Sequence, residues 1–253
     1  MLPKKVRFSL FILLVLLAPT LAVVSGCAQK ESPTGTTKTE TAAPAPTLTR
    51  PDVVTSATEA KELLVAGNER FVKGELAKKD LGDTRRQKLL TEGQKPFVAI
   101  VSCSDSRVPP ELIFDQGLGD LFVIRVAGNI LDKVGTGSVE YAVEHLHVPL
   151  VVVMGHEACG AVKATVEGGK PPTENIGAIV EKINPSVEKA KTAGATDKEL
   201  VEKSTKENVK AMLAELEKSP IIKEAAEHGK VTILGAYYHV GTGQVEWLEE
   251  AKH

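Results

Sequence analysis

This sequence contains few cysteines and has a small net charge. Its 253 residues include only three cysteines, which are too few and too far apart for a disulfide framework, and the formal net charge is −2. No long basic tract and no basic patch with interleaved aromatic residues occurs, so nucleic-acid binding has no electrostatic support. No internal repeat recurs at a fixed period. What remains is a chain with 42% hydrophobic residues, enough to build a substantial core.

The first 26 residues have the pattern of a secretory signal peptide. A basic start, "MLPKK", precedes the apolar run "FSLFILLVLLA" and a small-residue exit, and Pro19 interrupts a run that is already short for a membrane span. The stretch "VSGC" ends at Cys27 and resembles the lipobox of bacterial lipoproteins, in which this cysteine becomes the lipidated first residue. We therefore expect a lipidated Cys27 and an extracytoplasmic, membrane-anchored protein. Ordinary secretion with cleavage nearby is the alternative.

Residues 27–54 are expected to form a disordered tether. Thr, Pro, Ala and Ser dominate between residues 28 and 51, where large apolar side chains are nearly absent. Such a segment cannot bury enough surface to offset the entropy lost on ordering it. The composition becomes globular from about Thr55. The sequence therefore divides into a signal peptide (1–26), the tether (27–54) and a folded domain (55–253).

Four continuous apolar runs predict strands that are covered on both faces, as in parallel sheets. They are "PFVAIVSC" (96–103), "DLFVIRVAG" (120–128), "PLVVVMGH" (149–156) and "KVTILGAYY" (230–238). Helices are expected at 56–76, 83–93, 137–148 and 159–168, and across a long charged region from about 173 to 228. Strands that alternate with helices predict an α/β fold with an open, mainly parallel sheet flanked by helices.

Two of the predicted strands end on side chains that bind metals. Cys103 and His156 end these strands, and sites in parallel sheets form at the carboxyl ends. Within "GHEACG", His156 and Cys159 are three residues apart, so both can face one small cation. With Cys103 they make a Cys₂His set, and catalytic zinc sites use three ligands with one open position. Mg²⁺ or Ca²⁺ would prefer oxygen ligands. On spacing alone, two small buried cysteines, or a disulfide between them, stay equally open.

The motifs around these residues resemble those of the β-class carbonic anhydrases, in which C-x-D-x-R and H-x-x-C mark the zinc site. Here the motifs are "CSDSR" (103–107) and "HEAC" (156–159). The resemblance runs from about Glu59 to Leu248 and includes "GQKPF", "RVAGN", "GSVEYAVEHL" and "GAYYHVGTGQV". It implies one Zn²⁺ per chain on Cys103, His156 and Cys159, with water in the fourth place or, in a closed state, Asp105.

The resemblance also gives roles to Asp105 and Arg107. Arg107 would hold the Asp105 carboxylate by a two-pronged ion pair and keep it off the metal. Asp105 would then accept a hydrogen bond from zinc-bound hydroxide and orient it toward carbon dioxide. Without the adjacent cysteine, a surface ion pair or a turn-capping aspartate would explain both residues. Two thiolates donate more charge than imidazoles, so we expect activity to favour mildly alkaline pH.

Three further residues match plant-type members of this family. The resemblance implies that Gln94 donates a hydrogen bond to the substrate and that Phe122 and Tyr141 line an apolar pocket. As a strand residue and a helix residue, Phe122 and Tyr141 could equally belong to the core. In the family these side chains reach the zinc across a dimer interface, so a homodimer or a higher homo-oligomer is implied.

The expected protein is a membrane-tethered zinc enzyme, a lyase that interconverts carbon dioxide with bicarbonate and a proton. Ile100 stands where members with an allosteric bicarbonate site carry tryptophan, which argues against bicarbonate inhibition of that type, although Arg125 and Tyr238 match the rest of the set. Two alternatives stay open: the same site hydrolysing carbonyl sulfide or carbon disulfide, and a lipoprotein that binds zinc or bicarbonate without turnover. Asp105 and Arg107 argue against the last, because zinc storage needs neither.

Overall fold

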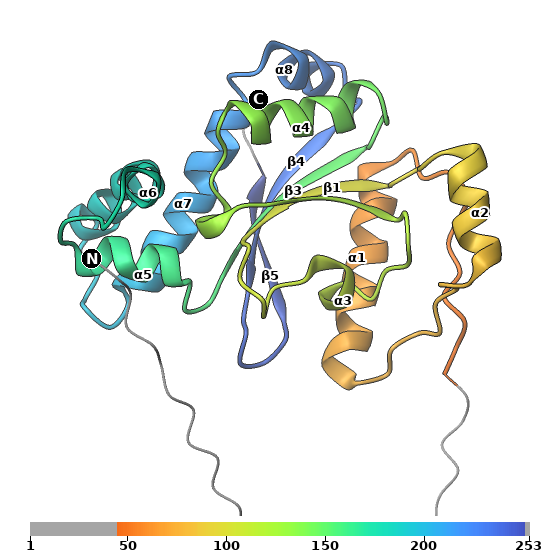
Figure 1. Cartoon of the computed structure of the whole chain (residues 1–253), viewed down its shortest axis with the longest axis horizontal. Helices are drawn as coiled ribbons and strands as arrows, with labels where there is room; N and C mark the ends of the chain where they lie inside the picture. The colour runs from red at the N-terminus through yellow and green to blue at the C-terminus, as the bar shows by residue number, and fades with distance from the viewer. Residues whose placement is uncertain (1–44, 251–253) are drawn as a thin grey trace, which may run out of the picture. The chain divides into compact units, whose positions relative to one another are not determined.

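The four predicted apolar runs form the parallel part of one sheet. The computed structural model describes residues 45–250. Its strands are β1 (Val98–Ser102), β2 (Leu121–Arg125), β3 (Leu150–His156), β4 (Thr232–Tyr238) and β5 (Val245–Glu250). They lie in the order β2-β1-β3-β4-β5, with the first four parallel and β5 antiparallel to β4 (Figure 1). The prediction of an open, mainly parallel α/β sheet is confirmed.

Burial along the strands follows their position in the sheet. Every residue of β1 and β3 is buried, as is every residue of β4 after Thr232. Helices cover both faces of these central strands, so neither face needs polar side chains. β2 lies at the edge of the sheet, where only Ile124 is buried. The edge strand therefore leaves part of its apolar surface uncovered.

The fifth strand is absent from the sequence prediction. β5 has no continuous apolar run, since its sequence is VEWLEE. An antiparallel edge strand needs few apolar residues, and here Val245 and Trp247 supply the contact with one core cluster and Leu248 with the other. A register shift between Leu234 and Ala236 accompanies this change of side.

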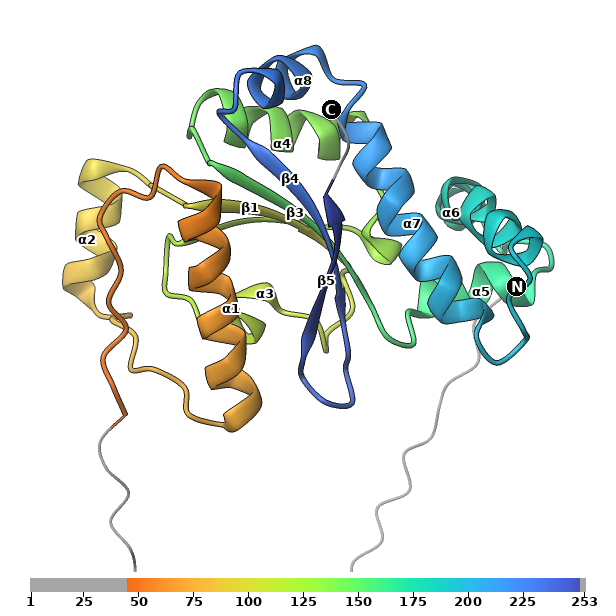
Figure 2. The same ribbon diagram turned by 180° about the vertical axis from the view of Figure 1, so that it is seen from behind.

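Helices cover the two faces of the sheet in separate layers (Figures 1 and 2). One core cluster joins the sheet to the larger layer, which consists of α4 (Lys133–Glu144), α5 (Gly160–Glu167), α6 (Glu174–Thr192), α7 (Leu200–Leu216) and α8 (Pro220–Glu227). The other cluster joins the opposite face to α1 (Ala57–Lys73) and the short α3 (Pro110–Ile113). A further helix, α2 (Asp83–Glu92), buries none of its residues.

The predicted helices are all present, and the structure adds two short ones. The long charged region divides into α6, α7 and α8, because capping residues begin new helices inside it. Thr173 caps α6, and Ser219 caps α8 just before Pro220. The additions are α3 and a 3₁₀ turn, η1 (Ala127–Asn129), which are too short for a periodic pattern.

The folded part begins before residue 55, where the sequence analysis places its boundary. Leu48 donates a backbone hydrogen bond to Lys78, the Arg50 guanidinium pairs with Asp120 at 2.8 Å, and Val54 is buried. The last ten residues of the predicted tether are thus fixed against the domain. The predicted signal peptide, Cys27 and residues 28–44 lie outside the described residues. No helix within residues 45–250 is both long and apolar enough to cross a membrane.

Candidate metal centre

The sheet topology brings the three predicted ligands together. Cys103 directly follows β1, and His156 is the last residue of the neighbouring parallel strand β3. Parallel strands deliver their carboxyl ends to the same edge of a sheet. The chain then turns back, with Ala158 at φ +52°, and Cys159 precedes the first residue of α5. The H-x-x-C spacing therefore spans a strand end, a tight turn and a helix start.

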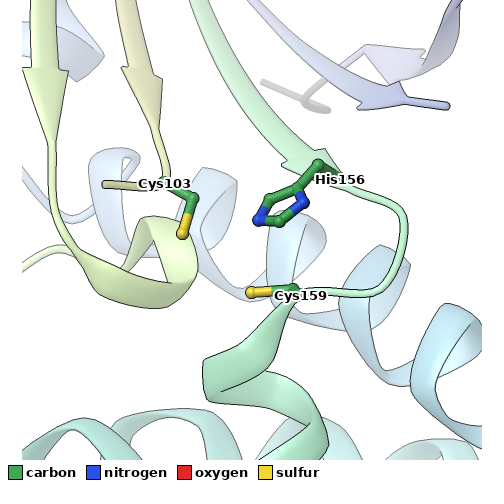
Figure 3. A group of neighbouring side chains, drawn as sticks. All are labelled: Cys103, His156 and Cys159. Carbon is green, nitrogen blue, oxygen red and sulfur yellow. The ribbon is translucent and has the colours of Figure 1, made fainter. Parts of the chain in front are cut away.

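The ligand atoms of Cys103, His156 and Cys159 all lie within 4.8 Å of one another. Figure 3 shows the two sulfur atoms and the imidazole ring facing a common centre. All three residues are buried, and both thiols are free. The disulfide that spacing alone leaves open is not formed. The cluster has the size and donor set of a three-ligand metal site.

The imidazole of His156 is oriented for ligation through Nε2. Its Nδ1 lies 2.9 Å from the Glu157 carbonyl oxygen, and only a protonated Nδ1 can donate to that acceptor. The lone pair then resides on Nε2, which is buried and has no hydrogen-bond partner within the described residues. A backbone carbonyl that fixes the tautomer in this way is the usual companion of a metal-bound histidine.

Backbone N–H groups stabilise a negative charge on Cys103. Its Sγ accepts hydrogen bonds from Gly128 N at 3.2 Å and from Asp105 N at 3.4 Å. The hydrogen bond from the Cys159 thiol, together with His156 and these two N–H groups, lowers the pKa of Cys103 despite its burial. The same hydrogen bond and burial raise the pKa of Cys159. Because cysteine binds metals as the thiolate, a cation bound here would displace the Cys159 proton.

The donor set fits a soft or borderline cation. Two sulfurs and one imidazole nitrogen suit Zn²⁺, and the unpartnered Nε2 of His156 is a buried lone pair that a cation would satisfy. Mg²⁺ and Ca²⁺ require oxygen ligands that these three side chains do not offer.

Asp105 lies beside the cluster, held by Arg107. Arg107 Nε and Nη2 donate to Asp105 Oδ1 and Oδ2 at 2.9 and 2.7 Å, which is the expected two-pronged ion pair. The backbone N–H of Arg107 also donates to Oδ1, so Asp105 is a turn cap as well. Hydrogen bonds from Arg107 hold the pKa of Asp105 well below its usual range. Asp105 Oδ2 is 4.0 Å from His156 Nε2.

Two arginines donate hydrogen bonds to backbone carbonyls of the loops that carry the cluster. Arg107 Nη2 donates to the Ala158 carbonyl at 3.3 Å, which links the Asp105 loop to the turn before Cys159. Arg125, at the end of β2, donates to the carbonyls of Cys103 and Asp105 at 2.9 and 2.6 Å. From the sequence, Arg125 is linked only to a bicarbonate site, and this backbone contact is not predicted. The N–H of Gly128 is not predicted either, although "RVAGN" begins with the last residue of β2, which ends at the same edge of the sheet.

Of the three residues expected to bind substrate, Gln94 and Tyr141 are exposed on this chain, and Phe122 is half-buried against the core. Gln94 is exposed and makes no hydrogen bond within residues 45–250. Tyr141 is 46% exposed, and its ring lies 6.1 Å from that of the half-buried Phe122. No hydrogen bond or aromatic contact in the described part joins any of the three to Cys103. Phe122 and Tyr141 are thus together, at the exposed edge of the sheet, without closing over the cluster.

Known proteins match this chain over most of its folded part. The sequence profile described as carbonic anhydrase matches residues 98–245. A carbonic anhydrase of Mycolicibacterium smegmatis is 41% identical over 191 residues, which are 74% of this chain and 91% of the relative. Carbonic anhydrase 2 of Mycobacterium tuberculosis is 39% identical over 194 residues, 75% of this chain and 92% of the relative.

Solved structures match the fold as well. A tetrameric beta-carbonic anhydrase of Sordaria macrospora superimposes with a TM-score of 0.60 at 28% identity, covering 66% of this chain and 87% of that chain. The Coccomyxa beta-carbonic anhydrase, solved with acetazolamide, gives 0.58 at 28% identity, with 66% and 78% covered. The chain belongs to the carbonic anhydrase family, in its beta class, and is by that membership a lyase.

Proposed function

We propose that this enzyme is zinc-dependent and catalyses the reversible hydration of carbon dioxide to bicarbonate and a proton. One observation carries the proposal: a buried Cys₂His cluster with an unpartnered imidazole nitrogen stands next to a carboxylate that is restrained by an arginine. Metal storage would explain the cluster but not the restrained carboxylate.

Cys103 Sγ, His156 Nε2 and Cys159 Sγ would hold the ion. Zinc there would supply the Lewis acidity that makes water a nucleophile near neutral pH. The three ligands leave one position open, which is the arrangement of catalytic rather than structural zinc sites. Glu157 contributes its carbonyl oxygen, which keeps the His156 ring in the ligating orientation.

Asp105 would accept a hydrogen bond from the attacking water and so aim its oxygen at the substrate carbon. Arg107 occupies both carboxylate oxygens with donors, which opposes rotation of Asp105 into the ligand position. Since the pKa of Asp105 is lowered, the carboxylate is an acceptor throughout the neutral range. In the reaction one C–O bond forms, and the water gives up one proton to solvent.

Substrate binding would involve a second copy of this chain. The exposed Tyr141 and the half-buried Phe122 form an aromatic pair beside the edge strand, and Gln94 is exposed with its amide free of hydrogen bonds within residues 45–250. In a homo-oligomer these side chains would line the neighbouring copy's site, where apolar walls suit a nonpolar gas. The tetrameric state of the Sordaria relative supports an oligomer of this kind.

The enzyme would act outside the cytoplasm, anchored through lipidated Cys27. The apolar run before Cys27, the "VSGC" stretch and the Thr- and Pro-rich segment after it support this placement. The tether would end near residue 45, where contacts with the domain begin.

The test measures zinc content and carbon dioxide hydration together. Wild type should bind one zinc per chain, and its stopped-flow hydration rate should rise toward mildly alkaline pH. Asp105→Ala should keep the zinc but lose hydration by about 10²- to 10⁴-fold, the range for a positioned acid–base group. Cys103→Ser should lose both.

Equal hydration rates in wild type and both variants would contradict the proposal. A wild-type protein with one zinc and no hydration at any pH would instead direct the assay to carbonyl sulfide and carbon disulfide.

A further inference from the structure

The inner face of α7 carries a fully buried amide, Asn208, near the metal centre. Its apolar neighbours along the helix include Val209, Met212 and Leu216, all buried. Burying an amide is unfavourable unless its polar atoms are hydrogen-bonded. An apolar residue would fill such a position at a lower desolvation cost. The presence of an amide therefore suggests that its hydrogen bond has a specific role.

Asn208 makes one hydrogen bond within the described residues, and it reaches the loop after β2. Its Nδ2 donates to the Gly128 carbonyl at 2.8 Å. A carbonyl can only accept, so the amide nitrogen must face Gly128 and the orientation of the side chain is determined. One turn further along α7, Met212 Sδ accepts a hydrogen bond from Leu131 N at 3.1 Å. The helix therefore holds this loop at two points.

Gly128 links this contact to the metal centre. Its N–H donates to Cys103 Sγ at 3.2 Å, and its backbone is left-handed, with φ +73°. The space beside the Gly128 Cα is filled, because a Cβ on Gly128 would lie 2.6 Å from Ile183 Cδ1 and 3.2 Å from Ala161 Cβ. The carbonyl side is held by Asn208. The direction of the Gly128 N–H toward Cys103 Sγ thus depends on the packing of Ile183 and Ala161 against Gly128 and on the hydrogen bond from Asn208.

We propose that Asn208 is a positioning residue for the Cys103 thiolate, acting through the η1 turn; this rests on the zinc site proposed above. By fixing the Gly128 carbonyl, Asn208 keeps the neighbouring N–H aimed at Sγ. That hydrogen bond sets the direction of the sulfur and would offset part of the thiolate's negative charge in the zinc site. Residues that orient metal ligands in this way typically change metal affinity by about 10- to 100-fold when they are replaced.

A purely structural role for Asn208 makes a different prediction. If the amide only fastened α7 to the loop, its loss would lower the stability of the metal-free protein and leave intrinsic zinc affinity unchanged. If it positions the thiolate, an apolar replacement of similar size should leave the metal-free protein folded and weaken zinc binding. Asn208 Oδ1 has no hydrogen-bond partner within the described residues, so leucine removes an unpaired polar atom along with the donor.

The experiment compares full-length wild type with Asn208→Leu and Asn208→Ala. Ser204→Ala is the control, because Ser204 is a buried residue one turn earlier on α7 whose hydroxyl has no hydrogen-bond partner within the described residues. Zinc affinity is measured by competition with a chromophoric chelator, and metal-free stability by thermal unfolding. Cobalt substitution adds a spectrum in which the thiolate-to-cobalt charge-transfer band reports sulfur geometry.

We expect both Asn208 variants to bind zinc about 10- to 100-fold more weakly and to shift the charge-transfer band, while Ser204→Ala matches wild type. Zinc affinity within twofold of wild type in whichever Asn208 variant folds would overturn the inference. So would unfolding of both metal-free variants beside a folded control, which would assign Asn208 to stability. Absence of zinc binding by wild type would instead contradict the proposed function.

Discussion

Replacing Gly128 by alanine should destabilise the protein and weaken its hold on zinc. Two effects combine at this position. Alanine in the left-handed region at φ +73° costs roughly 1–2 kcal/mol. The added methyl would also lie 2.6 Å from Ile183 Cδ1 and 3.2 Å from Ala161 Cβ, and forcing a group into a packed core costs roughly 1–3 kcal/mol.

The sum is about 2–5 kcal/mol of unfolding free energy. For a domain of this size each kcal/mol lowers the melting temperature by about 2–4 °C, so a decrease of roughly 4–20 °C is expected. Relief of the clash also moves the Gly128 N–H away from Cys103 Sγ, which it now meets at 3.2 Å. Zinc affinity should therefore fall together with stability.

Two other glycines separate the contributions. Gly74 ends α1 at φ +72° with nothing within 4 Å of an added Cβ, so Gly74→Ala isolates the backbone effect, about 1–2 kcal/mol. Gly177 lies inside α6, where an added Cβ would make only ordinary contacts with Pro171. Gly177→Ala should stabilise the protein by about 0.5–1 kcal/mol, because alanine favours helix.

Calorimetry of the metal-free proteins and chelator competition on the zinc-loaded ones measure both effects. The melting temperatures should rank Gly177→Ala, wild type, Gly74→Ala and Gly128→Ala in descending order. In the double variant Gly128→Ala/Ile183→Val the clashing methyl is absent, so part of the lost stability should return. The reasoning is refuted if Gly128→Ala melts within about 2 °C of wild type with unchanged zinc affinity.

Three further perturbations address the carboxylates and the anchor. Arg107→Lys keeps the charge but loses the fork that holds Asp105, so stopped flow should show hydration lowered by about 10²-fold or more with zinc content unchanged; a wild-type rate would contradict this role. Burial raises the pKa of Asp115, but hydrogen bonds from Lys79, the Ala77 N–H and Arg70 outweigh it and the pKa is lowered. The stability from Asp115 is therefore present above the unfolded pKa of about 3.9 and lost as the pH falls through the lower folded value. Denaturant unfolding should accordingly show Asp115→Asn costing stability at pH 7 and progressively less in acid, whereas an equal cost at every pH would contradict the sign. Cys27→Ala should move the enzyme from the membrane fraction to the soluble fraction without changing its hydration rate, and retention in the membrane would point to another anchor.

The sequence predicts the central sheet because strands that are buried on both faces appear as continuous apolar runs. β1 and β3 are uninterrupted apolar runs, and their ends already carry Cys103 and His156. β5 has no such apolar run. Its few apolar residues do not predict a strand by themselves, because the strand is stabilised by pairing with β4. The packing of residues 45–54 is hidden for the same reason: Arg50 stabilises it by pairing with Asp120, which is distant in sequence.

Two of the three ligands are likewise close in sequence, whereas Cys103 and the groups that support it are brought in by the fold. His156 and Cys159 lie within one motif, so their spacing predicts a shared cation. The Gly128 N–H, the Arg125 contacts with the carbonyls of Cys103 and Asp105, and the Asn208 amide depend on how the loop after β2 and the helix α7 pack. Tertiary contacts of this kind carry no periodic signal. The roles of Gln94, Phe122 and Tyr141 stay predictions, because no hydrogen bond or aromatic contact within the described residues joins them to the cluster.

The adjacency of β1 and β3 also makes the proposed metal binding depend on folding. Cys103 approaches His156 only after these two strands have paired, although β2 and α4 lie between them in the chain. The full ligand set therefore does not exist in an unfolded polypeptide, and the free energy of binding is gained by the assembled sheet alone. An ion that fills the cluster would therefore be bound only once the sheet has assembled.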